Sequence, residues 1–488
     1  MKKWNIIFLL IGIWSLINLQ GAESPRTLTK FNDFWSFKNY GILTEQQLSE
    51  LAAEVPKIDF NDKSWRKLKL PHDWAIEQAF SKDLPNRTGK LPWQGVGVYR
   101  KSFKLKHAER SKRYFIHFDG AMSHAQVWLN GKYLGKWPYG YNSFRMELTK
   151  ELNFDGENQL CVLLNNPANS SRWYPGGGIY RKVYLVKTSK VAISHDGVFI
   201  STKSCNQERA ELTISAEVEN TTDSDQAIYI HHSIKYKSKT IREFKSQTKT
   251  LGAGTKGDFQ DDILVNQAHL WSIEAPNMYQ IQSDVYVDGE LVDSLKNDFG
   301  IRSIKFDAQK GFFLNDKRVK LKGVCLHHDL GPLGAAVDRG AIERRFKLLK
   351  EMGCNAIRVA HNPMCPDFMD LCDRMGFVVV NELFDGWAKS KTENDYGKHF
   401  FEWYEKDIRN FVRRDRNHPS VIMWSSGNEV RDGYFGNKKL FAHSKMLAAE
   451  FKKHDPTRPV TVGCDNIWFG FGGFQKTVDI FGYNYKPH

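Results

Sequence analysis

The sequence has 488 residues, a formal net charge of +14 and a 13% share of aromatic residues. A chain of this length holds more than one domain, because single hydrophobic cores stop growing at roughly 250–300 residues. The positive charge raises the question of nucleic-acid binding, but lysines and arginines are scattered without a compact basic stripe, so we expect no nucleic-acid partner.

Residues 1–22 have the pattern of a signal peptide. Two lysines precede the apolar run Ile6–Ile17, and the small residues Gly21 and Ala22 follow it. The alternative is an N-terminal membrane anchor, but the run is short for a span of about 20 residues. We therefore expect a protein exported to the periplasm or secreted, with no membrane attachment after cleavage.

The region from residue 23 to 188 consists of short runs in which apolar and polar residues alternate, interrupted by Gly, Asn and Pro. Examples are Tyr114–His117, Ala125–Leu129 and Gln159–Leu164. This alternation predicts the antiparallel strands of a β-sandwich. Asn130–Gly131 predicts a hairpin turn, because both residue types accept positive φ.

Residues 189–303 show the same short runs of alternating apolar and polar residues over about 110 residues. Strands are predicted near Ala210–Val218, Ile228–Tyr236 and Gln280–Val287. About seven strands in such a length are typical of an immunoglobulin-like β-sandwich. The segment has no concentration of His, Glu or Asn, so we assign it a spacer role.

The region from residue 304 to 488 alternates apolar strand-like runs with amphipathic helical patterns, which predicts parallel strands with crossover helices. The predicted strands are Val319–Val324, Ala356–Val359, Val378–Val380, Val421–Ser425, Val460–Val462 and Ile480–Tyr483. The predicted helices are Arg339–Met352, Asp367–Met375, Phe400–Arg416 and Leu440–Lys453.

These elements favour a (β/α)₈ TIM barrel with about six of its eight strands present. A barrel without its last two units has an open edge and an exposed core. We therefore expect the sequence to be a fragment of a longer protein or a truncated gene product.

Seven cysteines occur at irregular spacings, most of them within apolar patterns, which predicts buried free thiols. No pair has the close spacing of a zinc site. They are Cys161, Cys205, Cys325, Cys354, Cys365, Cys372 and Cys464.

Polar residues follow the ends of the first four predicted barrel strands, which is where barrels of this type carry their functional groups. In strand order they are His327, His328 and Asp329, then His361 and Asn362, then Glu382, then Asn428 and Glu429.

Glu429 has the setting of a proton donor for glycoside cleavage, a reaction that needs one carboxylic acid and a second carboxylate. It lies where a buried strand gives way to a loop, and an apolar surround would raise its pKa towards neutrality. The neighbouring Asn428 can bind a sugar hydroxyl, including the 2-OH. The alternative for Glu429 is a helix-start carboxylate favoured by the helix dipole.

The segment from Arg414 to Glu429 resembles the acid/base signature of family 2 glycoside hydrolases, a group of β-galactosidases, β-glucuronidases and β-mannosidases. Phe299–Arg302 resembles the family's entry to the barrel, and the likeness runs over roughly residues 30–488 in the family's order. Four further segments resemble its N-terminal jelly-roll sandwich of sugar-binding type: Leu70–Trp74, Gly97–Arg100, Val127–Gly131 and Gly178–Arg181.

The resemblance implies that Glu429 is the acid/base and that Asn428 binds the substrate 2-OH. It also implies that Arg358 supports the nucleophile and that His361 contacts the sugar, with Asn362 continuing the same segment.

Three further positions carry expectations. The resemblance implies that His327 contacts the sugar and that Tyr485 hydrogen-bonds the nucleophile. Glu382 either belongs to the sugar site or holds Arg358 or Asn428 in place. For the histidines and the tyrosine, the alternative is a polar strand-end residue that satisfies loop backbone.

In this family the nucleophile is a Glu after the seventh strand, so the resemblance assigns it to no residue of this sequence. Asp385, Asp465 and Asp479 lie at the ends of other strands. Retention of configuration, which requires carboxyl groups about 5–5.5 Å apart, is implied by the resemblance alone.

Two departures from the galactosidase pattern bear on cofactor and substrate. Gly386 and Ala388 occupy the positions where magnesium-using galactosidases carry Glu and His, so we expect neither a metal nor another cofactor. The loop Ser170–Pro175 lacks the acidic residue that some galactosidases insert into the sugar pocket.

The expected function is exo-acting, retaining hydrolysis of terminal β-linked sugars in carbohydrate catabolism, on substrates derived from oligosaccharides or polysaccharides. β-Galactosidase is favoured because His327–Gly331 looks closest to galactosidase-type members. β-Glucuronidase and β-mannosidase are the alternatives within the family. The alternative from another class of protein is a catalytically dead sugar-binding protein. Homo-oligomer formation is left open.

Overall fold

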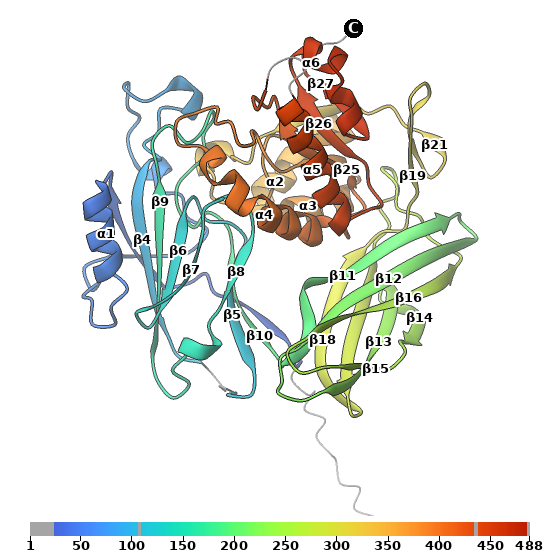
Figure 1. The fold of residues 1–488 in the computed structure, drawn as a ribbon, viewed down its shortest axis with the longest axis horizontal. Coiled ribbons are helices and arrows are strands. Elements are labelled where there is room, and N and C mark those ends of the chain that lie inside the picture. Colours follow the sequence, from blue (N-terminus) through green and yellow to red (C-terminus); the bar gives the residue numbers. More distant parts are fainter. Residues whose placement is uncertain (1–23, 106–108, 434–437, 486–488) are drawn as a thin grey trace, which may run out of the picture.

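A computed structural model of the chain describes residues 24–105, 109–433 and 438–485. The predicted signal peptide lies outside the described residues. Figure 1 shows three units: a blue β-sandwich, a green-to-yellow β-sandwich and a yellow-to-red α/β unit. Within these described ranges, none of the helices combines the length and apolar character that crossing a membrane requires.

The first sandwich packs a six-stranded sheet on a four-stranded sheet. The six strands are, in spatial order, β3 (Arg66–Leu68), β2 (Trp35–Gly41), β4 (Gly95–Phe103), β9 (Asn158–Asn166), β6 (Ala125–Leu129) and β7 (Lys132–Trp137). The four are β1 (Thr27–Lys30), β10 (Val183–Thr188), β5 (Arg113–Phe118) and β8 (Phe144–Glu147).

The predicted hairpin joins β6 to β7, with φ of 51° at Asn130 and 80° at Gly131. A helix that the sequence did not predict, α1 (Glu45–Glu54), lies outside this sandwich (Figure 1). It begins with a capping box between Thr44 and Gln47, which satisfies backbone N–H groups of the first turn.

The second sandwich has the predicted immunoglobulin-like character and contains eight strands, where about seven were expected. Its first sheet is β11 (Val191–Cys205), β12 (Arg209–Asn220) and β16 (Lys256–Asn266). Its second is β14 (Lys239–Lys245), β13 (Gln226–Tyr236), β17 (Tyr279–Val287) and β18 (Glu290–Phe299), with β15 (Lys249–Leu251) also pairing with β13.

A small antiparallel sheet precedes the α/β unit and corrects one predicted strand. Its strands are β19 (Ile304–Asp307), β20 (Gly311–Leu314) and β21 (Lys317–Arg318). The first barrel strand was predicted as Val319–Val324 but begins at Gly323. The reason is that the Val319 N–H donates to the Phe312 carbonyl at 2.9 Å, which holds it to the small sheet.

The α/β unit is the predicted incomplete (β/α)₈ barrel, a sheet of six parallel strands with helices outside it (Figure 1). The strands are β22 (Gly323–Leu326), β23 (Ala356–Val359), β24 (Val378–Glu382), β25 (Val421–Asn428), β26 (Val460–Cys464) and β27 (Ile480–Tyr483). The helices are α2 (Arg339–Glu351), α3 (Pro366–Met375), α4 (Phe400–Asp415), α5 (Lys438–His454) and the short α6 (Ile467–Phe471).

All seven cysteines are free, and four are buried as predicted. Cys325 is exposed, contrary to that prediction. It lies on β22, which is an edge strand of the parallel sheet and therefore lacks a neighbour on one side.

The first sandwich and the barrel share one continuous hydrophobic core. At their interface the Trp137 and Trp403 rings meet edge to face with centroids 5.1 Å apart, and the Trp137 indole N–H donates to Asp407 at 3.1 Å. The second sandwich has a core of its own. The first sandwich is therefore docked firmly on the barrel, and this docking carries one of its loops to the carboxyl ends of the barrel strands.

Candidate active site

The carboxyl ends of the parallel strands bring the predicted polar residues together at one edge of the sheet. Arg358 at the end of β23 donates from Nη2 to Glu382 Oε2 and to Asn428 Oδ1, each at 2.9 Å. β23, β24 and β25 are consecutive neighbours in the sheet, so residues from three separate segments meet within hydrogen-bond distance.

Glu382 is the buried centre of this group. Its side chain is fully buried, Ser425 donates to its Oε2 at 2.6 Å, and His361 Nδ1 lies 2.6 Å from its Oε1. Burial opposes its charge, but Arg358 and His361 nevertheless lower the pKa of Glu382. A carboxylate that bonds three side chains in this way orients them, which favours the holding role over direct sugar contact.

His361 is oriented by that carboxylate. A proton on Nδ1 shared with Glu382 leaves Nε2 on the opposite edge of the ring for another partner. Its ring packs against Trp173 and His327, with centroid separations of 5.6 and 5.5 Å.

The end of strand β25 and the side chain of Asn484 position Asn428 and Glu429. The Glu429 N–H donates to the Gly463 carbonyl at 2.7 Å, and Glu429 has a positive φ of 46°. Asn484 donates from Nδ2 to Glu429 Oε1 and to Asn428 Oδ1, each at 2.9 Å. The backbone therefore turns the Glu429 carboxylate away from the strand while Asn428 stays buried within the cluster.

The surroundings of Glu429 are polar, which corrects the expectation of an apolar setting. Asn484 bonds its carboxylate, and its charge acts on Arg172 and Lys391. Tyr485 is 81% exposed, and the negative charge of Glu429 raises the pKa of its phenol. Polar loops from two domains converge here, and this convergence could not be inferred from the apolar strand that precedes Glu429.

Three residues that the sequence did not single out for this site form an ionic network beneath Asn428. Asp385 accepts from Arg172 Nη2 at 2.6 Å, from Lys391 Nζ at 2.8 Å and from Asn428 Nδ2 at 3.1 Å. Lys391 also donates to the Asn428 carbonyl at 2.6 Å. Although burial opposes it, hydrogen bonds from Arg172 and the charge of Lys391 lower the pKa of Asp385 to about 2.

This network links two domains, since Arg172 belongs to the first sandwich. Asp385, three residues beyond Glu382, stood out in the sequence only as a nucleophile candidate that was set aside. Its position after the third strand was the one signal available. Arg172 lies in the Ser170–Pro175 loop, where the family resemblance pointed only to a missing acidic residue, and nothing local marks Lys391.

His327, His328 and Asn362 lie at the same strand ends in different settings. The His327 ring packs 4.9 Å from Trp173, and burial followed by the charge of His361 lowers its pKa. His328 is buried, with Nε2 3.1 Å from the Pro175 carbonyl, and burial lowers its pKa to about 3. Asn362 is fully buried, and neither atom of its amide group bonds a described residue.

A pocket opens between the Ser170–Trp173 loop of the first sandwich and the barrel loops beside His361. Aromatic rings and polar groups of the kind that bind small polar ligands form its walls. They include Tyr139, Tyr141, Arg172, Trp173, His361, Asp385 and Tyr396. Among the residues that the structure describes, no group of three or more His, Cys, Asp or Glu side chains is arranged to hold a metal ion.

Three family models match the chain in succession. They are the glycosyl hydrolase 2 galactose-binding domain-like model over residues 69–174, the glycosyl hydrolases family 2 model over 191–302 and the family 2 TIM barrel domain model over 306–481. Together with the fold and the grouped strand ends, these matches show that the chain belongs to family 2 of the glycosyl hydrolases.

The chain is also similar to individual proteins over most of its length. A β-galactosidase of Bacteroides ovatus is 41% identical over 95% of this chain, and a β-glucuronidase of Bacteroides fragilis is 31% identical over 81%. The crystal structure of a family 2 member from Bacteroides cellulosilyticus superimposes with a TM-score of 0.88 at 34% identity over 94% of the chain. The chain spans 57%, 57% and 58% of the lengths of these three proteins, respectively.

Proposed function

We propose that the protein to which this chain belongs is an exo-acting, retaining β-glycosidase of β-galactosidase type, with Glu429 as its proton donor. The observation that carries the proposal is the position of the Glu429 carboxylate at the end of β25, beside the buried Asn428 and bonded by Asn484 at 2.9 Å. General acid catalysis requires such a carboxyl group within reach of the leaving oxygen.

The neighbours of Glu429 have complementary roles in this proposal. Asn428 and His361 bind sugar hydroxyls, and Glu382 and Asp385 keep these groups in place. The reaction also needs a second carboxylate. None of residues 1–488 is assigned that role, and Arg358 and Tyr485 are proposed to face it.

The galactosidase preference rests on the 41% identical β-galactosidase and on the likeness of His327–Gly331 to galactosidase-type members. β-Glucuronidase is the second candidate, because a 31% identical relative has that activity in its name. A panel of nitrophenyl glycosides, assayed on a form extended to the length of these relatives, distinguishes the two. Faster cleavage of the glucuronide than of the galactoside would reject the galactosidase proposal.

The acid role of Glu429 predicts a loss that depends on the leaving group. In the extended form, we expect Glu429→Gln to slow cleavage of alkyl glycosides and disaccharides by about 10²–10⁴-fold, the usual contribution of a general acid. Aryl glycosides with activated leaving groups need little protonation and should lose far less. Steady-state rates on both substrate classes measure the difference.

Glu343→Gln, on the outer helix α2, is the matched control and should leave both rates unchanged. Equal losses on both substrate classes in Glu429→Gln would contradict the acid role. A non-catalytic saccharide-binding protein is the alternative from another class, and in that case the extended form binds galactose in calorimetry without hydrolysing any member of the panel.

We also propose that the protein is exported to the periplasm or secreted, on the basis of the pattern in residues 1–22. N-terminal sequencing of the mature protein tests this. Export with cleavage predicts a mature terminus near residue 23, and recovery of the intact N-terminus from the cytoplasm would reject it.

A further inference from the structure

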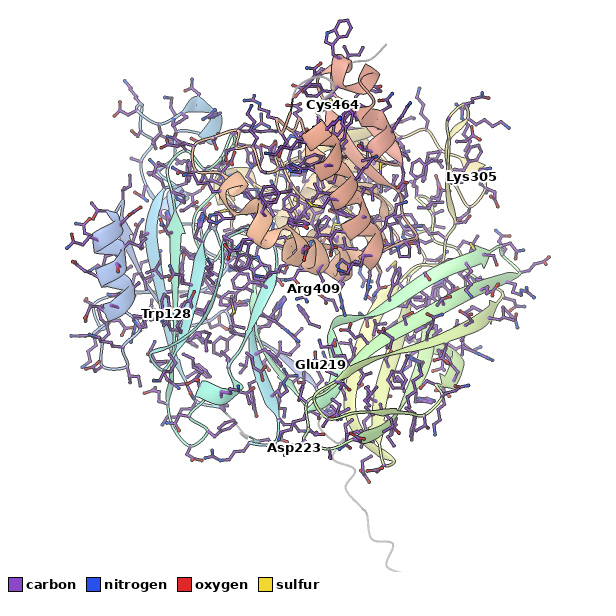
Figure 2. The ribbon with its side chains drawn as sticks, viewed as in Figure 1. Trp128, Glu219, Asp223, Lys305, Arg409 and Cys464 are labelled. Carbon is purple, nitrogen blue, oxygen red and sulfur yellow. The ribbon has the colours of Figure 1, made fainter. Side chains whose placement is uncertain are left out.

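Both ends of the peptide group between Asn428 and Glu429 are held by hydrogen bonds. Its carbonyl oxygen, that of Asn428, accepts from Lys391 Nζ at 2.6 Å. Its N–H, that of Glu429, donates to the Gly463 carbonyl at 2.7 Å. Figure 2 labels Cys464, the residue that follows Gly463 at the carboxyl end of β26. The orientation of this peptide group therefore depends on one lysine side chain and one neighbouring strand.

This peptide group sets the backbone conformation of Glu429. The φ angle of Glu429 is 46°, in the left-handed region that residues with a Cβ adopt only at a cost in free energy. Such a conformation persists where the surrounding structure holds it. Rotation of the peptide plane would relieve the strain and turn the Glu429 side chain in another direction. The bond from Lys391 therefore helps to fix where the carboxyl group points.

Lys391 is itself held in place by the barrel loop and by the first sandwich. Its side chain is 1% exposed, and its ammonium group also donates to Asp385 Oδ1 at 2.8 Å. Arg172 of the first sandwich bonds both oxygens of that carboxylate, from Nη2 at 2.6 Å and from Nε at 2.9 Å. The Lys391 backbone N–H donates to Asp395 Oδ2 at 2.6 Å. The ammonium group thus has a fixed position, as a positioning contact requires.

The charge of Lys391 also matters to the carboxyl group of Glu429. The charge of Glu429 acts on four titratable neighbours, which are Arg172, Lys391, Cys464 and Tyr485. Two of these are cations, and Asp385 lies between them. A nearby cation favours the ionised form of a carboxyl group. Lys391 therefore contributes to the potential in which Glu429 must keep its proton until the leaving oxygen takes it.

We propose that Lys391 is a positioning residue for the general acid, because it fixes the peptide group before Glu429 and so orients the carboxyl group towards the leaving oxygen. The first sandwich holds Lys391 in place through Arg172 and Asp385. This inference rests on the acid role of Glu429 proposed above. It gives the first sandwich a part in the acid step that requires no contact between that domain and the leaving group.

Values of kcat/KM for two substrate classes test this inference on the form extended to the length of the relatives. We expect Lys391→Met to slow cleavage of alkyl glycosides and disaccharides by about 10²-fold, the cost of misplacing a reacting group by about 1 Å. Activated aryl glycosides need little protonation and should lose less than about threefold. The ratio of the two values does not depend on how much of the preparation is folded, so a partly unfolded variant still gives a result.

The pH dependence of kcat/KM supplies a readout that a merely structural lysine would not move. Removing the charge in Lys391→Met should shift the alkaline limb of the profile, where the general acid loses its proton, upward by about 0.5–1 pH unit. Lys391→Arg keeps the charge and should leave the limb in place. Lys398→Met is the matched control, because Lys398 is an exposed lysine of the same loop that bonds Asn394 at 2.7 Å. It should change neither the ratio nor the limb.

Glu429→Gln separates this inference from the proposal on which it rests. A large loss on alkyl glycosides with a shifted limb in Lys391→Met, and neither change in Lys398→Met, supports the positioning role. If Glu429→Gln shows the leaving-group dependence but Lys391→Met slows both classes equally with an unmoved limb, the positioning role alone is overturned. If Glu429→Gln shows no leaving-group dependence, the acid role is rejected and the positioning role falls with it.

Discussion

At the scale of single residues, Asp385 links two domains at the candidate site. It joins Arg172 of the first sandwich, Lys391 of a barrel loop and the Asn428 side chain. The Lys391 side chain is 1% exposed, so its ammonium group relies on Asp385 and the Asn428 carbonyl for compensation. Removing one partner of a buried ion pair leaves an uncompensated charge.

Asp385→Ala should therefore lower the free energy of unfolding by about 3 kcal/mol, the range for breaking a buried pair. Urea denaturation followed by tryptophan fluorescence measures it. Asp223→Ala, at an exposed position far from the site, is the control and should change the free energy by less than about 0.5 kcal/mol. Similar effects of the two substitutions would show that Asp385 does not compensate Lys391.

Residue types and spacing predicted which groups gather at the strand ends, because parallel strands all end at one edge of the sheet. The structure brings Arg358, Glu382 and Asn428 together there. The sequence left open whether Glu382 contacts the sugar or holds Arg358 or Asn428, because burial of a charged side chain depends on contacts from several segments. The structure favours the holding role and adds His361 to the groups that Glu382 holds.

At the scale of elements, β13 carries an unusual histidine within the core of the second sandwich. His232 is 1% exposed, and its Nδ1 lies 2.9 Å from Ser283 Oγ on the paired strand β17. Burial, followed by the charge of His231, lowers the pKa of His232 to about 4. The His232 ring therefore takes up a proton in the folded protein only near pH 4, whereas in the unfolded chain it does so at a pH of about 6.5.

This histidine makes the second sandwich less stable in acid. A depressed pKa in the folded state means that its stabilising effect is complete above a pH of about 6.5 and is lost as the pH falls to about 4. The loss is about 1.4 kcal/mol per pH unit in that window. Urea denaturation between pH 7.5 and 4.5 should show a flatter dependence for His232→Gln than for wild type, and parallel curves would contradict the assignment.

Periodicity predicted two strands of the barrel closely: β23 and β27 coincide with their predicted ranges. It failed for β22, because an apolar residue near a strand start can pair with either of two sheets, and Val319 pairs with the small antiparallel one. It also missed α1. None of the residues of this helix is fully buried, so its apolar pattern is weak.

At the scale of the whole molecule, the two sandwiches differ in how they depend on the barrel. The second has a closed core of its own that includes Ile214, Ile230 and Ile281. The first shares its core with the barrel, and Trp137 and Tyr139 are buried in that shared core. A domain with its own core is able to fold alone.

Residues 189–303 expressed alone should therefore unfold cooperatively on heating, with the circular dichroism of a β-protein. Residues 24–188 expressed alone should expose the rings that pack on the barrel, bind the dye ANS and aggregate. Thermal scans and ANS fluorescence compare the two. A soluble first sandwich without dye binding would show that its core does not depend on the barrel.

The sequence by itself determined the class of each unit, the family and the residues at the strand ends, because these follow from local periodicity and from motifs a few residues long. The tertiary structure alone decided the Arg172–Asp385 bridge, whose partners lie 213 residues apart, and the cavity at which charged residues of all three units meet. Such contacts arise only when units from distant parts of the sequence pack against one another, since that packing determines which distant charges are buried together.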